Sequence, residues 1–173
     1  INHTGTVAIN DNIGTSGSLS GEVGITAGSN ITLNGDVYSN NENITFNQPI
    51  TLGKTVQVNS NIGAGNIVFG GTIDAAFGLT ANAGTGSVTF AGDIGAATGL
   101  TGITVVGTNV AFDDIGDAGT VGVAGATNVT DDGTTTFNGT IYKSNSQAYN
   151  ATTAHSIGGG GAPVAYTSSG DVV

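Results

Sequence analysis

The chain contains no cysteine, so disulfide bonds and thiolate metal ligands are excluded from its chemistry. Arginine, tryptophan and methionine are also absent, and the only basic side chains are Lys54 and Lys143, against 12 acidic residues and a formal net charge of -10. A surface of this sign repels phosphate backbones, so we expect no nucleic-acid partner. The chain has no long apolar run of the kind that spans a bilayer, so the sequence predicts no insertion into a membrane.

Side chains that could transfer protons are equally scarce. His3 and His155 are the only 2 histidines, and they stand near opposite ends of the chain. Nucleophilic catalysis by a Ser/His pair requires the two side chains to meet in space, and this separation indicates no such cluster. The sequence therefore predicts that the protein is not an enzyme and needs no cofactor.

One short pattern is abundant: an apolar, a small and an apolar residue, followed by Asn, Asp or Gly and a further apolar residue. Its copies are Thr6–Ile13, Asn30–Val37, Asn43–Ile50, Asn66–Ile73, Ser87–Ile94, Asn109–Ile115 and Thr134–Ile141. With one exception, successive copies start roughly 21–25 residues apart, which fits one turn of a stacked solenoid. The exception is the step from Asn30 to Asn43, which is about half as long. Five of the 6 Phe residues occupy the same position in the pattern.

Alternation of apolar with small or polar residues is typical of a β-strand with one buried face. A second apolar segment separates most copies, in Val23–Ala27, Val56–Asn59, Leu79–Ala83, Ile103–Val106 and Val121–Ala124. Each period of roughly 22 residues then wraps once around a narrow core, and successive coils pair in parallel. The predicted fold is all-β, a parallel β-helix (β-solenoid) of about seven or eight coils.

Coils stacked in register predict columns of like residues in the core. The expected aromatic column contains Phe46, Phe69, Phe90, Phe112 and Phe137, with Ile9 and Leu33 extending it. Beside it we expect an aliphatic column of Ile44, Ile67, Val88 and Val110. An amide ladder or simple turn formation is expected of the Asn residues that precede the strands, which are Asn30, Asn43, Asn66 and Asn109.

Two places depart from the period. The short interval between the second and third copies means either that both belong to one coil or that an irregular coil lies near Asn40–Glu42. Near the C-terminus, the run Gly158–Pro163 is typical of a flexible connection. We therefore divide the chain into a β-solenoid repeat domain, residues 1–157, and a Gly-rich linker with a terminal strand, residues 158–173.

The segments GNIVFGGTID, from Gly65, and LTANAGTGSVTF, from Leu79, resemble the repeat region of filamentous-haemagglutinin-like bacterial exoproteins and related adhesins. The resemblance extends over roughly residues 5–141. It implies a right-handed parallel β-helix that serves as a cell-surface fibre or adhesin shaft.

Two acidic pairs, Asp113–Asp114 and Asp131–Asp132, are candidate metal ligands. Their separation along the chain is close to one coil, so they are placed to stack above one another. Ca²⁺ prefers about six to eight oxygen ligands, which carboxylates supply. We regard Asp113, Asp114, Asp131 and Asp132 as a candidate calcium site, with solvated turn aspartates as the alternative.

The outward positions of the strands suggest further partners. A column of Thr32, Thr45, Thr89 and Thr136 is a candidate ice-binding array, although Val68 and Ala111 interrupt it. Exposed Thr, Asn and Gly residues also suit weak polar contacts with sugars, so host or matrix glycans are candidate partners.

The repeat favours a structural role outside the cell. The end coil of a solenoid presents unpaired backbone N–H and C=O groups, so we expect self-association through the ends. The leading hypothesis is a secreted structural protein of a bacterial cell surface, as a fibre, shaft or adhesin segment, with end-to-end polymerisation into a filament as one form of it. The alternative is a β-solenoid module that binds glycan, calcium or ice.

Overall fold

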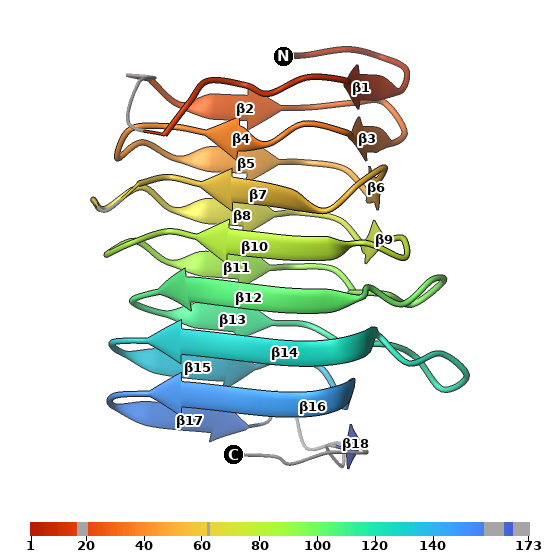
Figure 1. Cartoon of the computed structure of the whole chain (residues 1–173), viewed down its shortest axis with the longest axis vertical. Coiled ribbons are helices and arrows are strands. Elements are labelled where there is room, and N and C mark those ends of the chain that lie inside the picture. Colours follow the sequence, from red (N-terminus) through yellow and green to blue (C-terminus); the bar gives the residue numbers. More distant parts are fainter. Residues whose placement is uncertain (17–20, 62, 158–164, 168–173) are drawn as a thin grey trace.

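The computed structural model describes residues 1–16, 21–61, 63–157 and 165–167, with 154–157 and 165–167 described by their backbone alone. These residues form strands and turns stacked as a solenoid (Figure 1). None of the described residues is in a helix, so none belongs to a helix long and apolar enough to cross a membrane. In Figure 1 the front strands run leftward, the fainter strands behind them run rightward and the chain descends, so the coil is right-handed.

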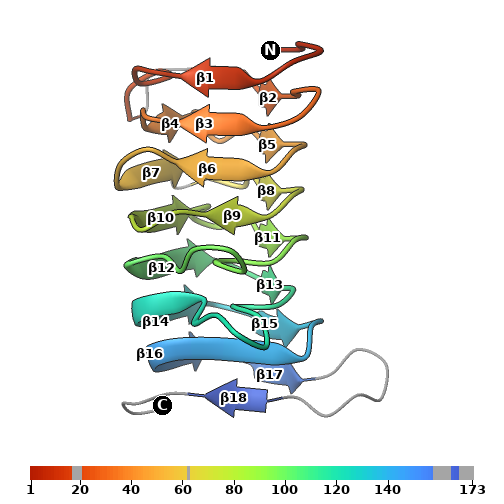
Figure 2. The same ribbon diagram turned by 90° about the vertical axis from the view of Figure 1, so that its right-hand side faces the viewer.

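Three parallel sheets form the walls, and the chain visits them in the same order in each coil. The first sheet, which faces the viewer in Figure 2, contains β1 (Val7–Ile9), β3 (Ile31–Leu33), β6 (Ile50–Leu52) and β9 (Ile73–Asp74). The second contains β4 (Val37–Tyr38), β7 (Val56–Asn59), β10 (Gly78–Asn82), β12 (Gly102–Gly107), β14 (Val123–Asp131), β16 (Ile141–Ala151) and β18 (Ala165–Thr167). The third contains β2 (Val23–Ile25), β5 (Ile44–Phe46), β8 (Ile67–Phe69), β11 (Val88–Phe90), β13 (Val110–Phe112), β15 (Thr134–Phe137) and β17 (Ala154–Ile157).

The wall begun by the first sheet continues along the whole solenoid. Beyond β9 it consists of single bridges and then of the first residues of β16, which pair with β18. One residue per coil lies in this column, in the order Val7, Ile31, Ile50, Ile73, Ile94, Ile115, Tyr142 and Tyr166. The prediction of a parallel β-solenoid with about seven or eight coils is therefore confirmed.

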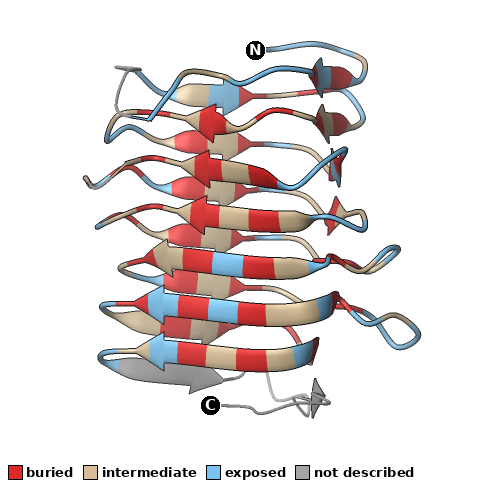
Figure 3. Ribbon diagram, viewed as in Figure 1, coloured by how far each residue is buried: buried red, intermediate tan, exposed pale blue. Residues whose placement is uncertain are grey.

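Strand alternation decides which side chains fill the core. In β5, β8, β11 and β13 the first and third residues are buried and the middle residue is half-buried (Figure 3). The predicted aromatic column forms, with neighbouring ring centroids between 4.9 and 6.0 Å apart along Phe46, Phe69, Phe90, Phe112 and Phe137. The adjacent aliphatic column is confirmed by the register of Ile44, Ile67, Val88 and Val110.

The predicted N-terminal extension of the aromatic column is wrong. Ile25, and not Ile9 or Leu33, is in register with Phe46 on the third sheet. Ile9 and Leu33 lie on the first sheet, where they are in register with Leu52. The sequence pattern grouped them with the Phe residues because strands of the first and third sheets share the same apolar–small–apolar motif.

The placement of different copies on different sheets also explains the short interval between the second and third copies of the pattern. These copies form β3 and β5, which are the first-sheet and third-sheet strands of a single coil, so the first of the two alternatives is correct. The segment Val23–Ala27, predicted as a strand between copies, forms β2 on the third sheet. In β14 the ladder to β12 is made by Thr127–Asp131 and not by Val121–Ala124.

Glycine closes the corners where adjacent coils come closest. A Cβ atom on Gly35 would lie 2.1 Å from the carbonyl oxygen of Asp11, and one on Gly86 would lie 2.2 Å from that of Gly65. No side chain fits at such distances, so these corners require glycine. We name the corners by the sheets they join: first-to-second, second-to-third and third-to-first.

The predicted C-terminal segment is described only in part. Residues 158–164, where the Gly-rich linker is predicted, and residues 168–173 lie outside the described residues. The backbone of β18 pairs in parallel with Ile141–Lys143 of β16, so this short strand adds to the same stack as the repeat domain.

Candidate functional site

The two acidic pairs of the candidate calcium site lie at different corners. Asp113 and Asp114 follow β13 at the third-to-first corner, whereas Asp131 ends β14 and Asp132 follows it at the second-to-third corner. A third-sheet strand separates these corners, and four extended residues span roughly 13 Å. One Ca²⁺ ion, with oxygens at about 2.3–2.6 Å, cannot contact both pairs. Among the described residues, no group of three or more His, Asp or Glu side chains is arranged to hold a metal ion.

The spacing of the two pairs is shorter than the local coil. Phe112 is in register with Phe137, so one complete coil separates these two residues along the chain. The step from Asp113 to Asp131 is shorter than this and stops one corner before the coil is complete. The prediction that the pairs stack fails for this reason.

Asp113 and Asp114 share their corner with Asp93 of the preceding coil. Burial, and then the negative charges of Asp113 and Asp114, raise the pKa of Asp93; burial and Asp114 likewise raise the pKa of Asp113. Oδ1 of Asp114 accepts hydrogen bonds from the backbone N–H groups of Thr140 and Ile141. Asp114 therefore organises the turn of the next coil, while the corner as a whole carries like-charge repulsion.

The core near the C-terminal end contains a group of buried polar side chains. Asp131 is 1% exposed, and its Oδ1 accepts a hydrogen bond of 3.2 Å from the Thr135 hydroxyl. The hydroxyl oxygens of Thr127 and Ser144, both buried, lie 2.6 Å apart. The coils that contain β14, β15 and β16 are therefore held by polar contacts inside the core as well as by apolar packing.

Two tyrosines complete this end of the aromatic column. The rings of Tyr142 and Tyr149 pack edge-on against Phe137, with centroid distances of 4.8 and 4.9 Å. The Tyr149 hydroxyl donates a hydrogen bond of 2.8 Å to Oε1 of Gln147, whose Nε2 donates to the carbonyl of Tyr142. Parallel ring stacking thus gives way to perpendicular packing, and the polar tip of Tyr149 is satisfied by a hydrogen bond.

The predicted threonine column is only partly correct. Thr32 lies on the first sheet, where it is in register with Thr51. The outward column of the third sheet contains, in order, Gly24, Thr45, Val68, Thr89, Ala111 and Thr136. Threonine alternates there with aliphatic residues, so this face does not carry a continuous threonine array.

Asparagine side chains join adjacent coils mainly through the backbone. Oδ1 of Asn43 accepts a hydrogen bond of 2.9 Å from the N–H of Asn66, whose own Oδ1 accepts one of 2.8 Å from the N–H of Ser87. Asn30 lies at another corner and donates to the hydroxyl of Thr51. Amide-to-amide hydrogen bonds occur at other positions, in the pairs Asn34–Asn10 and Asn61–Asn40.

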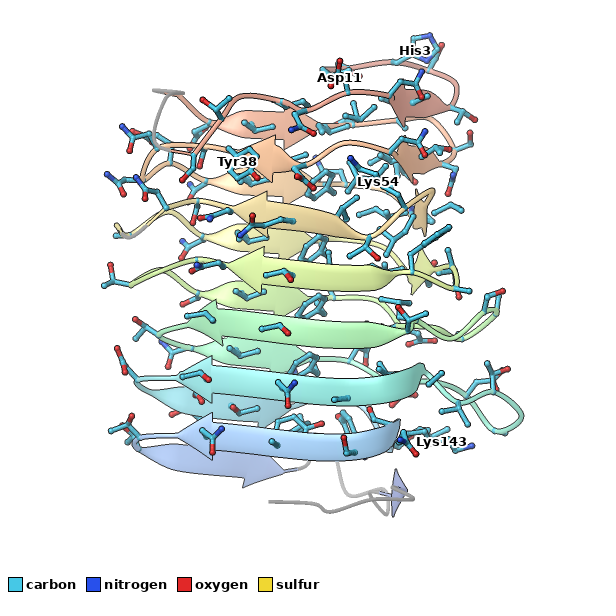
Figure 4. All side chains as sticks on the ribbon, viewed as in Figure 1. His3, Asp11, Tyr38, Lys54 and Lys143 are labelled. Carbon is cyan, nitrogen blue, oxygen red and sulfur yellow. The ribbon has the colours of Figure 1, made fainter. Side chains whose placement is uncertain are left out.

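The histidines lie toward opposite ends of the chain. His3 is exposed near the N-terminus, and its Nδ1 accepts a hydrogen bond of 2.9 Å from the N–H of Gly5 (Figure 4). His155 belongs to β17, whose backbone alone is described.

A loop at the first-to-second corner is held by one of the two lysines. Nζ of Lys143, labelled in Figure 4, donates hydrogen bonds to the carbonyl oxygens of Asp117 and Ala118. Oδ1 of Asp117 accepts hydrogen bonds from the N–H groups of Gly119 and Thr120, and these bonds lower the pKa of Asp117. The carboxylate and the lysine therefore fix the loop from both sides.

The sequence did not predict a shallow groove on the outer face of the second sheet. The groove has a volume of about 370 Å³ and is lined by residues of four consecutive coils. Its floor includes Gly78 and Gly102, and its polar groups are those of Thr55, Thr80, Thr101, Thr104 and Asn128. The available sequence signal was the presence of glycine at the start of two otherwise regular strands, β10 and β12.

No protein-family model matches the chain, and neither a characterised protein nor a solved structure is significantly similar to it. Function is therefore inferred from the residues and their placement.

Proposed function

We propose that this chain is a segment of a secreted structural protein of a bacterial cell surface, and that it acts through its shape, as a fibre, shaft or adhesin segment, rather than by catalysis. The observation that carries the proposal is the unbroken column from Val7 to Tyr166, with one residue per coil in register. Each coil pairs with the next on its walls, so bending or stretching the rod must break several ladders together. Such a rod suits a spacer that holds another part of a protein away from a surface.

Two further observations support the proposal. The resemblance of the segment Gly65–Phe90 to repeats of filamentous-haemagglutinin-like exoproteins favours a bacterial surface. The outer faces of the second and third sheets carry mainly Thr, Asn, Gly and Ala, whereas the acidic residues gather at corners and strand ends. Flat, weakly charged walls of this kind suit extended contact with other surface polymers.

End-to-end association is part of the proposal. Within the described residues, β1 pairs only with β3. The N–H of Val7 donates to Asn30 and the carbonyl of Ile9 accepts from Asn34, so both residues point their backbone groups toward β3. By strand alternation, the N–H and C=O of Ala8 point to the open edge. A strand from a second copy can add there and continue the ladder.

Replacing Ala8 tests this association. Ala8→Pro removes the N–H on the open edge but leaves the hydrogen bonds to β3, because Val7 and Ile9 make those bonds. Proline is tolerated at such a position in an edge strand. Ala8→Thr is the matched control, since it keeps the N–H and places at Ala8 the residue found at Thr32 and Thr51 of the same column. Sedimentation velocity across dilution should show linear assemblies for wild type and Ala8→Thr, and monomers for Ala8→Pro with an unchanged melting temperature.

Electron micrographs of the same samples separate the two parts of the proposal. Short straight rods without filaments would remove end-to-end assembly and leave the shaft role. Particles that are flexible or of irregular outline would contradict the shaft role itself.

A further inference from the structure

We infer that the groove on the outer face of the second sheet binds a linear, uncharged polysaccharide, laid along the solenoid axis. The inference starts from two glycines in the groove, of which Gly102 is not required by packing between the coils. At Gly102 a Cβ atom would have its nearest neighbour, the carbonyl oxygen of Ala126, at 3.6 Å, which is ordinary contact. At Gly78 the nearest atom is Cγ2 of Thr55, at 3.2 Å, so a Cβ atom there requires a small shift of that side chain. Neither residue has a positive φ.

These two positions differ from the corner glycines. At Gly35 and Gly86 a Cβ atom would clash with the backbone of a neighbouring coil, whereas at Gly102 a Cβ atom makes only ordinary contact. Glycine in a strand weakens it, and such a glycine often marks a bulge, a tight bend, or a site where a ligand or another backbone approaches closely. With Gly78 above it, Gly102 leaves the floor of the groove open for such an approach.

The lining of the groove decides the chemistry of the ligand. Thr55, Thr80, Thr101, Thr104 and Asn128 present hydroxyl and amide groups, and none of the described residues that line the groove carries a charge. Hydroxyls and amides both donate and accept hydrogen bonds, which matches the hydroxyl groups of a sugar. The net charge of -10 disfavours an acidic polysaccharide.

An exposed aromatic residue adjoins the groove residue Gly78 in the chain. Phe77 is 38% exposed, precedes Gly78 in the chain, and accepts a hydrogen bond from the N–H of Thr101 through its carbonyl. A sugar ring has an apolar face of C–H groups, and an aromatic side chain beside a hydroxyl-lined groove offers that face a partner.

The spacing of the coils in the second sheet indicates how the polysaccharide lies in the groove. The groove crosses four coils, and parallel strands lie about 4.8 Å apart, which is close to the length of one pyranose unit in an extended chain. A linear chain along the axis therefore meets the lining residues of one coil for each sugar unit. Affinity should rise steeply up to about four sugar units and little beyond that, because the lining ends at the fourth coil.

The test measures binding of cellotetraose, laminaritetraose and mannotetraose by isothermal titration calorimetry. Gly102→Val fills the floor of the groove with a residue that suits a strand. Gly24→Val is the matched control, because Gly24 lies in a strand on the third sheet and a Cβ there meets no described atom within 4 Å. Melting curves should show that both variants fold.

We expect at least one of the neutral tetrasaccharides to bind, Gly102→Val to weaken this binding at least tenfold, and Gly24→Val to leave it unchanged. Phe77→Ala should weaken it severalfold. The inference is overturned if none of the three binds at millimolar concentration, or if Gly102→Val binds as wild type does, or if both glycine variants lose binding equally.

An acidic ligand is the competing outcome, because Lys54 precedes Thr55 at one end of the groove. Because the net charge of -10 repels an acidic chain, tetragalacturonate should bind at least tenfold more weakly than the best neutral probe. A preference for tetragalacturonate that disappears in Lys54→Met would overturn the assignment of an uncharged ligand. The groove exists in the isolated rod, so none of these results bears on the proposed shaft role.

Discussion

The ring centroids of Phe69 and Phe90 lie 4.9 Å apart, and their planes are 8° from parallel. The two residues occupy successive coils in register, and both are almost completely buried. Their separation is close to the spacing of parallel strands, about 4.8 Å. The stack therefore repeats the backbone ladder inside the core and joins each coil to the next.

Phe90 is predicted to be a major source of stability. Phe90→Ala should lower the free energy of unfolding by about 3–5 kcal/mol, because it removes a buried ring between two others and leaves a cavity. Phe77→Ala, at an exposed position, should change it by less than about 0.5 kcal/mol. Urea denaturation measures both, and a loss below about 1 kcal/mol for Phe90→Ala contradicts a closely packed column.

Glycine substitutions should separate corners from strands. Gly86→Ala should destabilise by about 1–3 kcal/mol, because the new Cβ would lie 2.2 Å from the carbonyl oxygen of Gly65 and the coils must move apart. Gly102→Ala should be neutral or stabilise by about 0.4–1 kcal/mol, since alanine restricts the unfolded chain and fits the folded one. Equal melting temperatures for the two variants would contradict the close approach at this corner.

The acidic corner should make stability depend on pH. The pKa of Asp93 is raised above its ordinary value of 3.8, so the Asp93 carboxyl group holds its proton more tightly in the folded state than in the unfolded state. The resulting stability is fully present below pH 3.8 and is lost as pH rises through the folded pKa. Asp93→Asn should remove this loss and be more stable than wild type at neutral pH, as measured by denaturation at a series of pH values.

Asp117→Asn is the control of opposite sign. Hydrogen bonds from Gly119 and Thr120 lower the pKa of Asp117 below its ordinary value of 3.8. Its contribution to the stability of the fold is therefore present above pH 3.8 and is lost as pH falls through the pKa of the folded state. This variant should be less stable than wild type at neutral pH. If Asp93→Asn and Asp117→Asn shift stability in the same direction, the electrostatic account of the corner is wrong.

Calcium should act on this protein as a general counterion. Asp113 and Asp114 lie at a different corner from Asp131 and Asp132, so no single ion can use both pairs. Calcium chloride and sodium chloride at equal ionic strength should therefore raise the melting temperature similarly, by screening the net charge. A larger effect of calcium that is lost in Asp113→Asn would instead establish a specific site at the third-to-first corner.

The hydroxyl pair in the C-terminal core should show strong coupling. Thr127→Val removes the hydroxyl that lies 2.6 Å from the buried Ser144 hydroxyl. This change should lower the free energy of unfolding by about 1–3 kcal/mol. Adding Ser144→Ala removes the other hydroxyl, so the double variant should be more stable than the sum of the single changes predicts. Strict additivity in a double-mutant cycle would contradict a direct hydrogen bond.

The sequence alone determined the all-β solenoid and its aromatic column. Both follow from periodic features: alternation within each copy of the pattern, and the recurrence of Phe at nearly constant intervals. Alternation decides which side chains face inward in any strand, and recurrence at about one coil length stacks equivalent side chains. Tertiary context was not needed for either conclusion.

Only the tertiary structure decided which wall each copy joins. Ile9, Leu33 and Phe46 occupy the same position in the pattern, yet the first two belong to the first sheet and Phe46 to the third. The same uncertainty misplaced the acidic pairs and hid the groove over Gly102. The physical reason is that all three walls bury alternate residues of short strands, so the local pattern is the same in each. The hydrogen-bonded register between coils, which depends on the length of every intervening turn, distinguishes them.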